Sequence, residues 1–156
     1  MKTTYTLITL ISVLISIPKS FAIYFEVTNV CEDTPYLQAE VPVYTLTNVL
    51  EFTKYNLKNY AIPHLANDNG IVSILDTPVG LQSYEFIAQN HIRIYGWCFE
   101  VDGEQSEIFA RDYTIDPEFQ TSLRWFYGYS EVIEGVWIHT CRVVSKGSNP
   151  RFCQKF

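Results

Sequence analysis

The side chains best suited to recognising a ligand in this sequence are aromatic and lie at alternate positions of two expected strands. The strands are expected at residues 92–101 and 123–129. Tyrosine and tryptophan suit a binding platform because the ring supplies contact area while its O–H or N–H orients the bound group. Apolar residues at strand period are more often core, so packing beneath the loop at 104–117 is the competing interpretation. The candidate binding residues are Tyr95, Trp97, Phe99, Trp125, Tyr127 and Tyr129.

Catalytic and metal chemistry find little support in the sequence. Four acidic residues cluster between 100 and 107, but acid–base work needs two carboxylates held in a cleft, and these flank an expected exposed hairpin. The segment 67–70 resembles the middle of a calcium loop. Aligning Gly70 with the loop glycine puts Leu65 where the first carboxylate belongs, which indicates a turn. Hydrolase, metalloprotease and nucleotide-binding motifs are absent. The sequence predicts a non-enzymatic protein without a metal or a cofactor.

Four cysteines offer redox chemistry, and all of them follow the expected leader. An even number in an exported chain indicates two disulfides, for which three connectivities are possible. We favour Cys98–Cys141, which joins two expected strands, and Cys31–Cys153, which ties the C-terminal end to the first strand. Zinc is disfavoured because no Cys-x-x-Cys pair is present. A catalytic thiol is disfavoured because an exported thiol with three other cysteines available usually oxidises.

The first 22 residues have the pattern of a secretory signal peptide. Lys2 precedes an apolar run at 5–18, and Ser20 and Ala22 supply the small residues of a cleavage site. The run is too short to span a membrane, which takes about 20 apolar residues. We therefore expect cleavage after Ala22 and a secreted or periplasmic mature chain of residues 23–156, without a membrane span.

Composition indicates a single acidic domain. The chain has 156 residues, of which 47% are hydrophobic and 24 are aromatic, enough to bury a core. Acidic residues outnumber basic ones by 17 to 11. Loss of two leader lysines leaves 9 basic residues and moves the net charge from −6 to −8. Such a charge disfavours a nucleic-acid partner.

The elements that must position these residues follow from periodicity and turn signals. Helical spacing predicts a helix at 48–60, with Asn48 and Glu51 forming a capping box. Pro42 indicates that its strand lies at a sheet edge. A brief helix is expected at 83–90. Strands are expected at 23–30, 36–44, 71–75, 92–101, 123–129 and 136–144. Asp102-Gly103 and Glu134-Gly135 are the expected hairpin turns. This order predicts an α+β fold with one main helix on a mixed or antiparallel sheet and an extra C-terminal hairpin.

Several motifs in order resemble the transcobalamin-like C-terminal domain family. The family is β-grasp-like, and in transcobalamin itself this domain closes over a corrinoid held against a helical domain. Cobalamin binding is therefore implied by the resemblance alone. The matching segments are Tyr95-Gly96-Trp97, Val101-Asp102-Gly103, Ala110-Arg111-Asp112-Tyr113 and Leu123-Arg124-Trp125-Phe126-Tyr127, with the helix at 47–57 and the strand at 72–74.

Together these features predict an exported β-grasp-like binding module that holds a small ligand or a protein partner on its aromatic surface. The alternative is a structural or adhesive surface component that oligomerises through residues 136–144.

Overall fold

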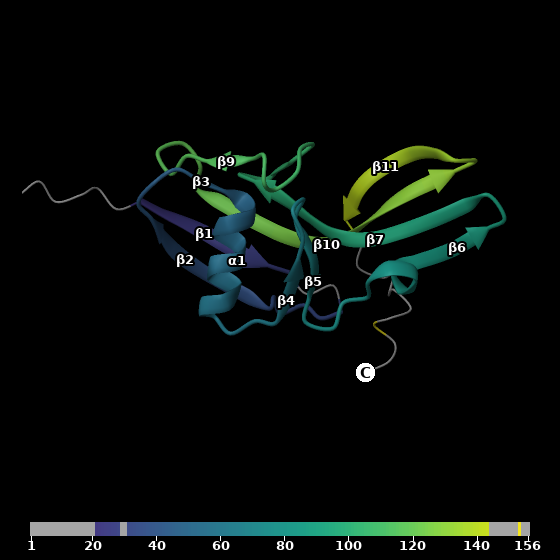
Figure 1. Cartoon of the computed structure of the whole chain (residues 1–156), viewed down its shortest axis with the longest axis horizontal. Coiled ribbons are helices and arrows are strands. Elements are labelled where there is room, and N and C mark those ends of the chain that lie inside the picture. The colour runs from purple at the N-terminus through teal and green to yellow at the C-terminus, as the bar shows by residue number, and fades with distance from the viewer. Residues whose placement is uncertain (1–20, 29–30, 144–152, 154–156) are drawn as a thin grey trace, which may run out of the picture.

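The computed structural model of the chain describes residues 21–28, 31–143 and 153 (Figure 1). The helical elements are α1 (Val49–Asn59) and the 3-10 turn η1 (Gly80–Ser83). The strands are β1 (Phe21–Val27), β2 (Leu37–Val43), β3 (Thr47–Asn48), β4 (His64–Ala66), β5 (Ile71–Ile74), β6 (Tyr84–Ala88), β7 (His91–Val101), β8 (Glu104–Gln105), β9 (Thr114–Ile115), β10 (Ser122–Ile133) and β11 (Val136–Val143).

The expected α+β, β-grasp-like class is wrong, because the chain is mostly β. Strands make up 52% of the described residues and helical residues 13%. Two differences from expectation account for this. The strand β6 occupies most of the segment 83–90, where a brief helix was expected, and β10 continues to Ile133 instead of ending at 129. Strand pairing therefore extends well beyond the part of the sheet that the single α-helix accompanies.

The main sheet is mixed and has seven strands. Its central order is β2-β1-β10-β7-β6, with β11 added to β10 and β8 added to β7. The pair β1–β10 is parallel and all other pairs are antiparallel. Pro42 lies in the edge strand β2, as predicted. The predicted hairpin turns at 102–103 and 134–135 are confirmed, and all four turn residues have the positive φ that such two-residue turns require.

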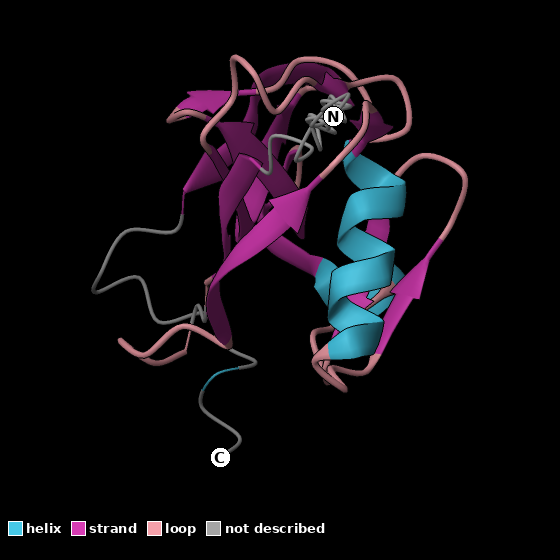
Figure 2. Ribbon diagram, turned by 90° about the vertical axis from the view of Figure 1, so that its left-hand side faces the viewer, coloured by secondary structure: helices cyan, strands magenta, loops and turns pink. Residues whose placement is uncertain are grey.

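The predicted helix is confirmed, and Asn48 caps its N-terminus as expected, whereas the Glu51 carboxylate accepts from Lys54 Nζ instead of completing the expected capping box. The Asn48 side chain accepts a hydrogen bond of 2.8 Å from the Glu51 backbone N–H. The buried face of α1 packs on the sheet, where the Phe52 and Phe25 ring centroids lie 5.4 Å apart, edge to face. Figure 2 shows α1 running beside the main group of strands, with one further strand on its other side. One helix therefore covers only part of one sheet face.

Strands β7 and β10 pair over eleven positions, from Val101 opposite Leu123 to His91 opposite Ile133. The half nearer α1 is mostly buried, whereas the other half carries β6 and β11 on its two edges. In Figure 1 this second half projects to the right, away from α1. We call it the arm.

Both favoured disulfides, Cys98–Cys141 and Cys31–Cys153, are confirmed.

Of the predicted leader, residues 1–20 lie outside the described residues. Phe21 and Ala22 begin β1. Within the described part of the chain, no helix is long and apolar enough to cross a membrane.

Candidate functional site

The six candidate binding residues form three directly opposed pairs on one face of the β7–β10 ladder. The structure places Tyr95 opposite Tyr129, Trp97 opposite Tyr127 and Phe99 opposite Trp125. Neighbouring ring centroids lie 5.3 to 6.2 Å apart along the row. We call these six side chains the aromatic ladder. The strand alternation expected from the sequence thus places all six side chains on one face of the sheet.

Four members of the aromatic ladder are buried, so it is not an open platform. Trp125 and Tyr127 are only 1% and 2% exposed, and Trp97 and Phe99 are also buried. The polar atom of each of the three buried polar rings has a partner. The Trp125 Nε1–H donates to Thr53 Oγ1 at 2.8 Å, and the Trp97 Nε1–H donates to Thr77 Oγ1 at 3.0 Å. The Tyr127 hydroxyl donates to the carbonyl of Pro78 at 3.1 Å. These positions fit core packing.

The aromatic ladder ends in the arm in a group of charged side chains on the same sheet face. Tyr95 and Tyr129 are partly exposed there. The Tyr95 hydroxyl donates to Glu85 Oε2 at 2.7 Å, and the Arg93 guanidinium lies 4.9 Å from the Tyr129 ring centroid. Partial burial, together with the Glu85 carboxylate, raises the pKa of Tyr95 to about 12. Tyr95 therefore stays protonated at neutral pH.

Glu131 is the buried acid of this group. Its Oε1 accepts hydrogen bonds from Arg93 Nε at 2.9 Å and pairs with His91 Nε2 at 3.2 Å. The hydrogen bond from Arg93 holds the pKa of Glu131 below its usual value, against the opposing effect of burial, and His91 adds to the lowering. A carboxylate held ionised in this way is a poor general acid. Among the residues that the structure describes, no group of His, Cys, Asp or Glu side chains is arranged to hold a metal ion.

The expected turn at 67–70 is confirmed as the tip of the β4–β5 hairpin. Asn67 Oδ1 accepts from the backbone N–H groups of Asn69 and Gly70.

The four acidic residues at 100–107 flank the exposed β7–β8 hairpin, as expected. Asp102 Oδ1 accepts four hydrogen bonds from Thr121 and Ser122. Although desolvation tends to raise the pKa of Asp102, these bonds outweigh it and keep that pKa below its usual value.

The outer edge of β7 has a gap between its two partner strands. β6 pairs with β7 from His91 as far as Ile94, and β8 pairs with Glu100 and Val101. A pocket of about 300 Å³ opens at this gap. We call it the edge pocket. Its lining from the sheet is Trp97, Cys98, Phe99, Trp125 and Cys141. Three members of the aromatic ladder thus reach the pocket wall.

Two loops complete the edge pocket. The tip of the β4–β5 hairpin contributes Asn67 and residues 69–72, and the segment after β8 contributes Ser106 and residues 108–110. None of the lining residues carries a charge, although the whole chain has a net charge of −6. The pocket is therefore an uncharged, largely apolar site on an acidic protein.

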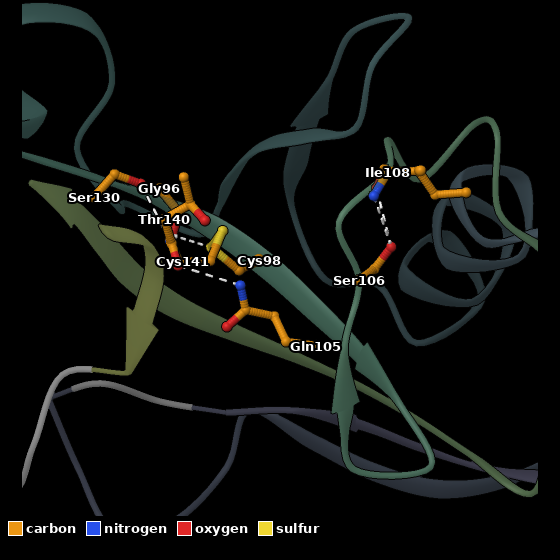
Figure 3. The surroundings of a disulfide bond; sticks show 8 residues. All are labelled: Gly96, Cys98, Gln105, Ser106, Ile108, Ser130, Thr140 and Cys141. Carbon is orange, nitrogen blue, oxygen red and sulfur yellow. Dashed lines mark hydrogen bonds between the residues drawn. A yellow bond between two sulfur atoms is a disulfide. The ribbon is translucent and has the colours of Figure 1, made fainter. Parts of the chain in front are cut away.

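The Cys98–Cys141 disulfide fixes one wall of the pocket (Figure 3). The Gln105 side-chain amide donates to the Thr140 carbonyl at 3.2 Å, and the Cys141 N–H donates to Ser130 Oγ at 3.2 Å. On the other wall, the Ser106 hydroxyl donates to the Ile108 carbonyl and accepts from the Ile108 backbone N–H. Ile108 remains 52% exposed at the rim.

Sequence reasoning found Trp97, Phe99 and Trp125 but missed the loop residues Ile108 and Phe109. The available signal was an apolar pair inside a segment otherwise rich in charged and polar residues. The gap between β6 and β8 had no sequence signal, because β6 itself was not expected.

Comparison of the chain with known protein families, curated proteins and solved structures finds no match.

Proposed function

We propose that this chain is an exported, non-enzymatic binding module that takes an uncharged apolar group into the edge pocket. The observation that carries the proposal is that three members of the aromatic ladder, the disulfide and the 108–110 loop converge on one pocket. Its volume of about 300 Å³ lies at the lower end of the range for small-molecule sites. Export is supported by the leader pattern and by the two disulfides, which are typical of oxidising compartments.

Binding of a neutral apolar dye tests this proposal. Nile red is titrated into the protein, and Trp97 and Trp125 report on the same site through their own fluorescence. We expect a saturable rise in dye emission that Ile108→Glu abolishes, because the variant puts a charge at the apolar rim. Leu81→Glu is the matched control, since Leu81 is 83% exposed and lies outside the pocket.

Cyanocobalamin is a second probe, because the resemblance to transcobalamin-like domains implies a corrinoid. Equal dye binding by wild type and Ile108→Glu, with both proteins folded, would contradict the proposal. Tight binding of cyanocobalamin, lost in the same variant, would identify the ligand class.

A structural or adhesive role through β11 is the second candidate function. β11 pairs with β10 on one side, and no described strand pairs with its other side. Four of its apolar side chains are exposed, namely Val136, Trp137, Ile138 and Val143. An exposed apolar edge strand favours pairing with another strand. Light scattering over a range of concentrations tests this role. Association that Ile138→Lys removes would support it, and a monomer at every concentration would exclude it.

A further inference from the structure

The main chain of Trp97 in β7 faces the edge pocket. Antiparallel strands alternate between residues that bond to the partner and residues whose N–H and C=O point the other way. The Phe99 carbonyl accepts from the Ser106 N–H at 3.2 Å, on the side of β7 away from β10. The Asp102 N–H donates to the Ser122 carbonyl at 3.1 Å, on the side of β10.

A bond on β10 agrees with this alternation. The Trp125 carbonyl, opposite Phe99, accepts from the Thr28 N–H at 2.9 Å, on the side away from β7. Phe99 and Trp125 are therefore a pair without mutual hydrogen bonds. Hydrogen-bonded and non-hydrogen-bonded pairs alternate along the ladder. The pair Trp97–Tyr127, two positions from Phe99–Trp125, is therefore also a pair without mutual hydrogen bonds. The N–H and C=O of Trp97 consequently point away from β10, toward the gap.

No described strand pairs with Trp97 on that side. β6 pairs with β7 only as far as Ile94, and the pairing of β7 with β8 starts at Glu100. The gap covers the five residues 95–99, or ~17 Å of extended chain. At the edge pocket, the main-chain donor and acceptor of Trp97 therefore have no strand partner on that side among the described residues.

We propose that the edge pocket binds a short extended peptide segment of a partner protein, which pairs through its main chain with Trp97 and places an uncharged apolar side chain in the pocket. This inference rests on the proposed function and names its ligand class. An apolar small molecule would fill the pocket but leave the Trp97 donor and acceptor without partners. One residue of an extended peptide supplies both partners, as in other complexes where a peptide adds a strand to a sheet.

The uncharged lining defines the side chain that the pocket accepts. Ile71, Ile108 and Phe109 supply apolar contact, and no lining residue can pair with a charged group. The net charge of −6 also disfavours an acidic peptide, because the protein and the peptide would repel each other. The expected segment therefore carries a residue such as leucine, isoleucine or valine within about five residues of extended chain.

The first part of the test measures the free protein. In amide hydrogen exchange followed by NMR, the Trp97 N–H should exchange at least tenfold faster than the Cys98 N–H, which faces β10. Equal protection of the two amides would show that the Trp97 donor is already satisfied and would overturn the inference.

The second part selects ligands from a displayed library of random hexapeptides on the folded, oxidised protein, with the Ile108→Glu protein as the counter-target. An enriched peptide is then synthesised, together with variants N-methylated at each position. We expect one N-methyl group to weaken binding at least tenfold. We also expect the bound peptide to slow exchange of the Trp97 N–H at least tenfold.

Three outcomes would overturn the inference: no peptide enriched on the wild type over Ile108→Glu, binding insensitive to N-methylation at every position, or unchanged exchange at Trp97. If Nile red still binds in an Ile108-dependent manner, the pocket binds apolar groups but not peptide, and the proposed function survives. If the dye fails as well, both proposals fall. The Leu81→Glu protein is the control in each arm and should behave as the wild type.

Discussion

The indole N–H of Trp125 donates a 2.8 Å hydrogen bond to the hydroxyl of Thr53, a residue 72 positions earlier in the chain. Both side chains are almost completely buried. The bond joins the centre of β10 to the inner face of α1, so the helix position and the aromatic ladder depend on each other.

Replacing Trp125 by alanine should therefore lower the free energy of unfolding by about 3–5 kcal/mol, because it empties a large buried site. Chemical denaturation measures the change. Trp137→Ala is the control of the same residue type, since Trp137 is 58% exposed, and it should cost less than about 0.5 kcal/mol. Similar small losses in both variants would mean that Trp125 is not part of the core.

Thr53→Val should separate the hydrogen bond from the packing. The substitution keeps the volume but leaves the Trp125 N–H buried without its acceptor, which costs about 1–3 kcal/mol. Thermal and urea unfolding both report the loss. A variant as stable as the wild type would show that the bond contributes nothing to stability.

Both disulfides should be present in the native protein. Peptide mapping without reduction should yield two crosslinked products, one joining Cys98 to Cys141 and the other joining Cys31 to Cys153. Replacing Cys98 and Cys141 together by alanine should lower the free energy of unfolding by about 2–5 kcal/mol, as is usual for small exported domains. Four thiols open to alkylation in the folded protein would contradict this prediction.

Acid should remove the stabilisation that Glu131 provides. Because the pKa of Glu131 is lower in the folded chain than in the unfolded one, its contribution is complete above the unfolded value and is lost as the pH falls through the folded value. The difference in unfolding free energy between wild type and Glu131→Gln should therefore be largest near pH 7 and shrink toward pH 3. The exposed residue Glu107 offers the control, and Glu107→Gln should show a small difference that varies little with pH. A constant difference for Glu131→Gln would exclude an ionic role.

The mature protein should begin at Ile23, because the small residues at Ser20 and Ala22 mark the cleavage site. This cut removes Phe21 and Ala22 from β1 and keeps the pairing of Ile23 with Val41. Intact mass of secreted material tests the position. A product that retains the apolar run at 5–18 would contradict signal cleavage.

Local signals in the sequence predicted the local features of the fold. Asn48 identified the start of α1 because a capping side chain acts within one turn, and Asp102-Gly103 identified a hairpin because its turn needs positive φ. Strand alternation also placed the members of the aromatic ladder on one face. These features depend on a few adjacent residues, so the sequence alone was sufficient.

The features that sequence reasoning missed depend on distant parts of the chain. Residues 84–88 have no buried face, and β6 forms because the edge of β7 supplies hydrogen-bonding groups. Missing β6 made the helical content seem larger and led to the wrong fold class. The edge pocket was missed for the same reason, since it exists only where β6 and β8 fail to meet.

The parallel pairing of β1 with β10 also constrains the order in which the chain can fold. Tyr24 lies opposite Ser122, so β1 can pair with β10 only after most of the polypeptide has been synthesised. Contacts between such distant segments slow folding, because a long loop must close before they form. The β7–β10–β11 meander, built from neighbouring segments, can assemble first and offer β10 as a template. We expect β1 and β2 to dock last, as the rate-limiting step.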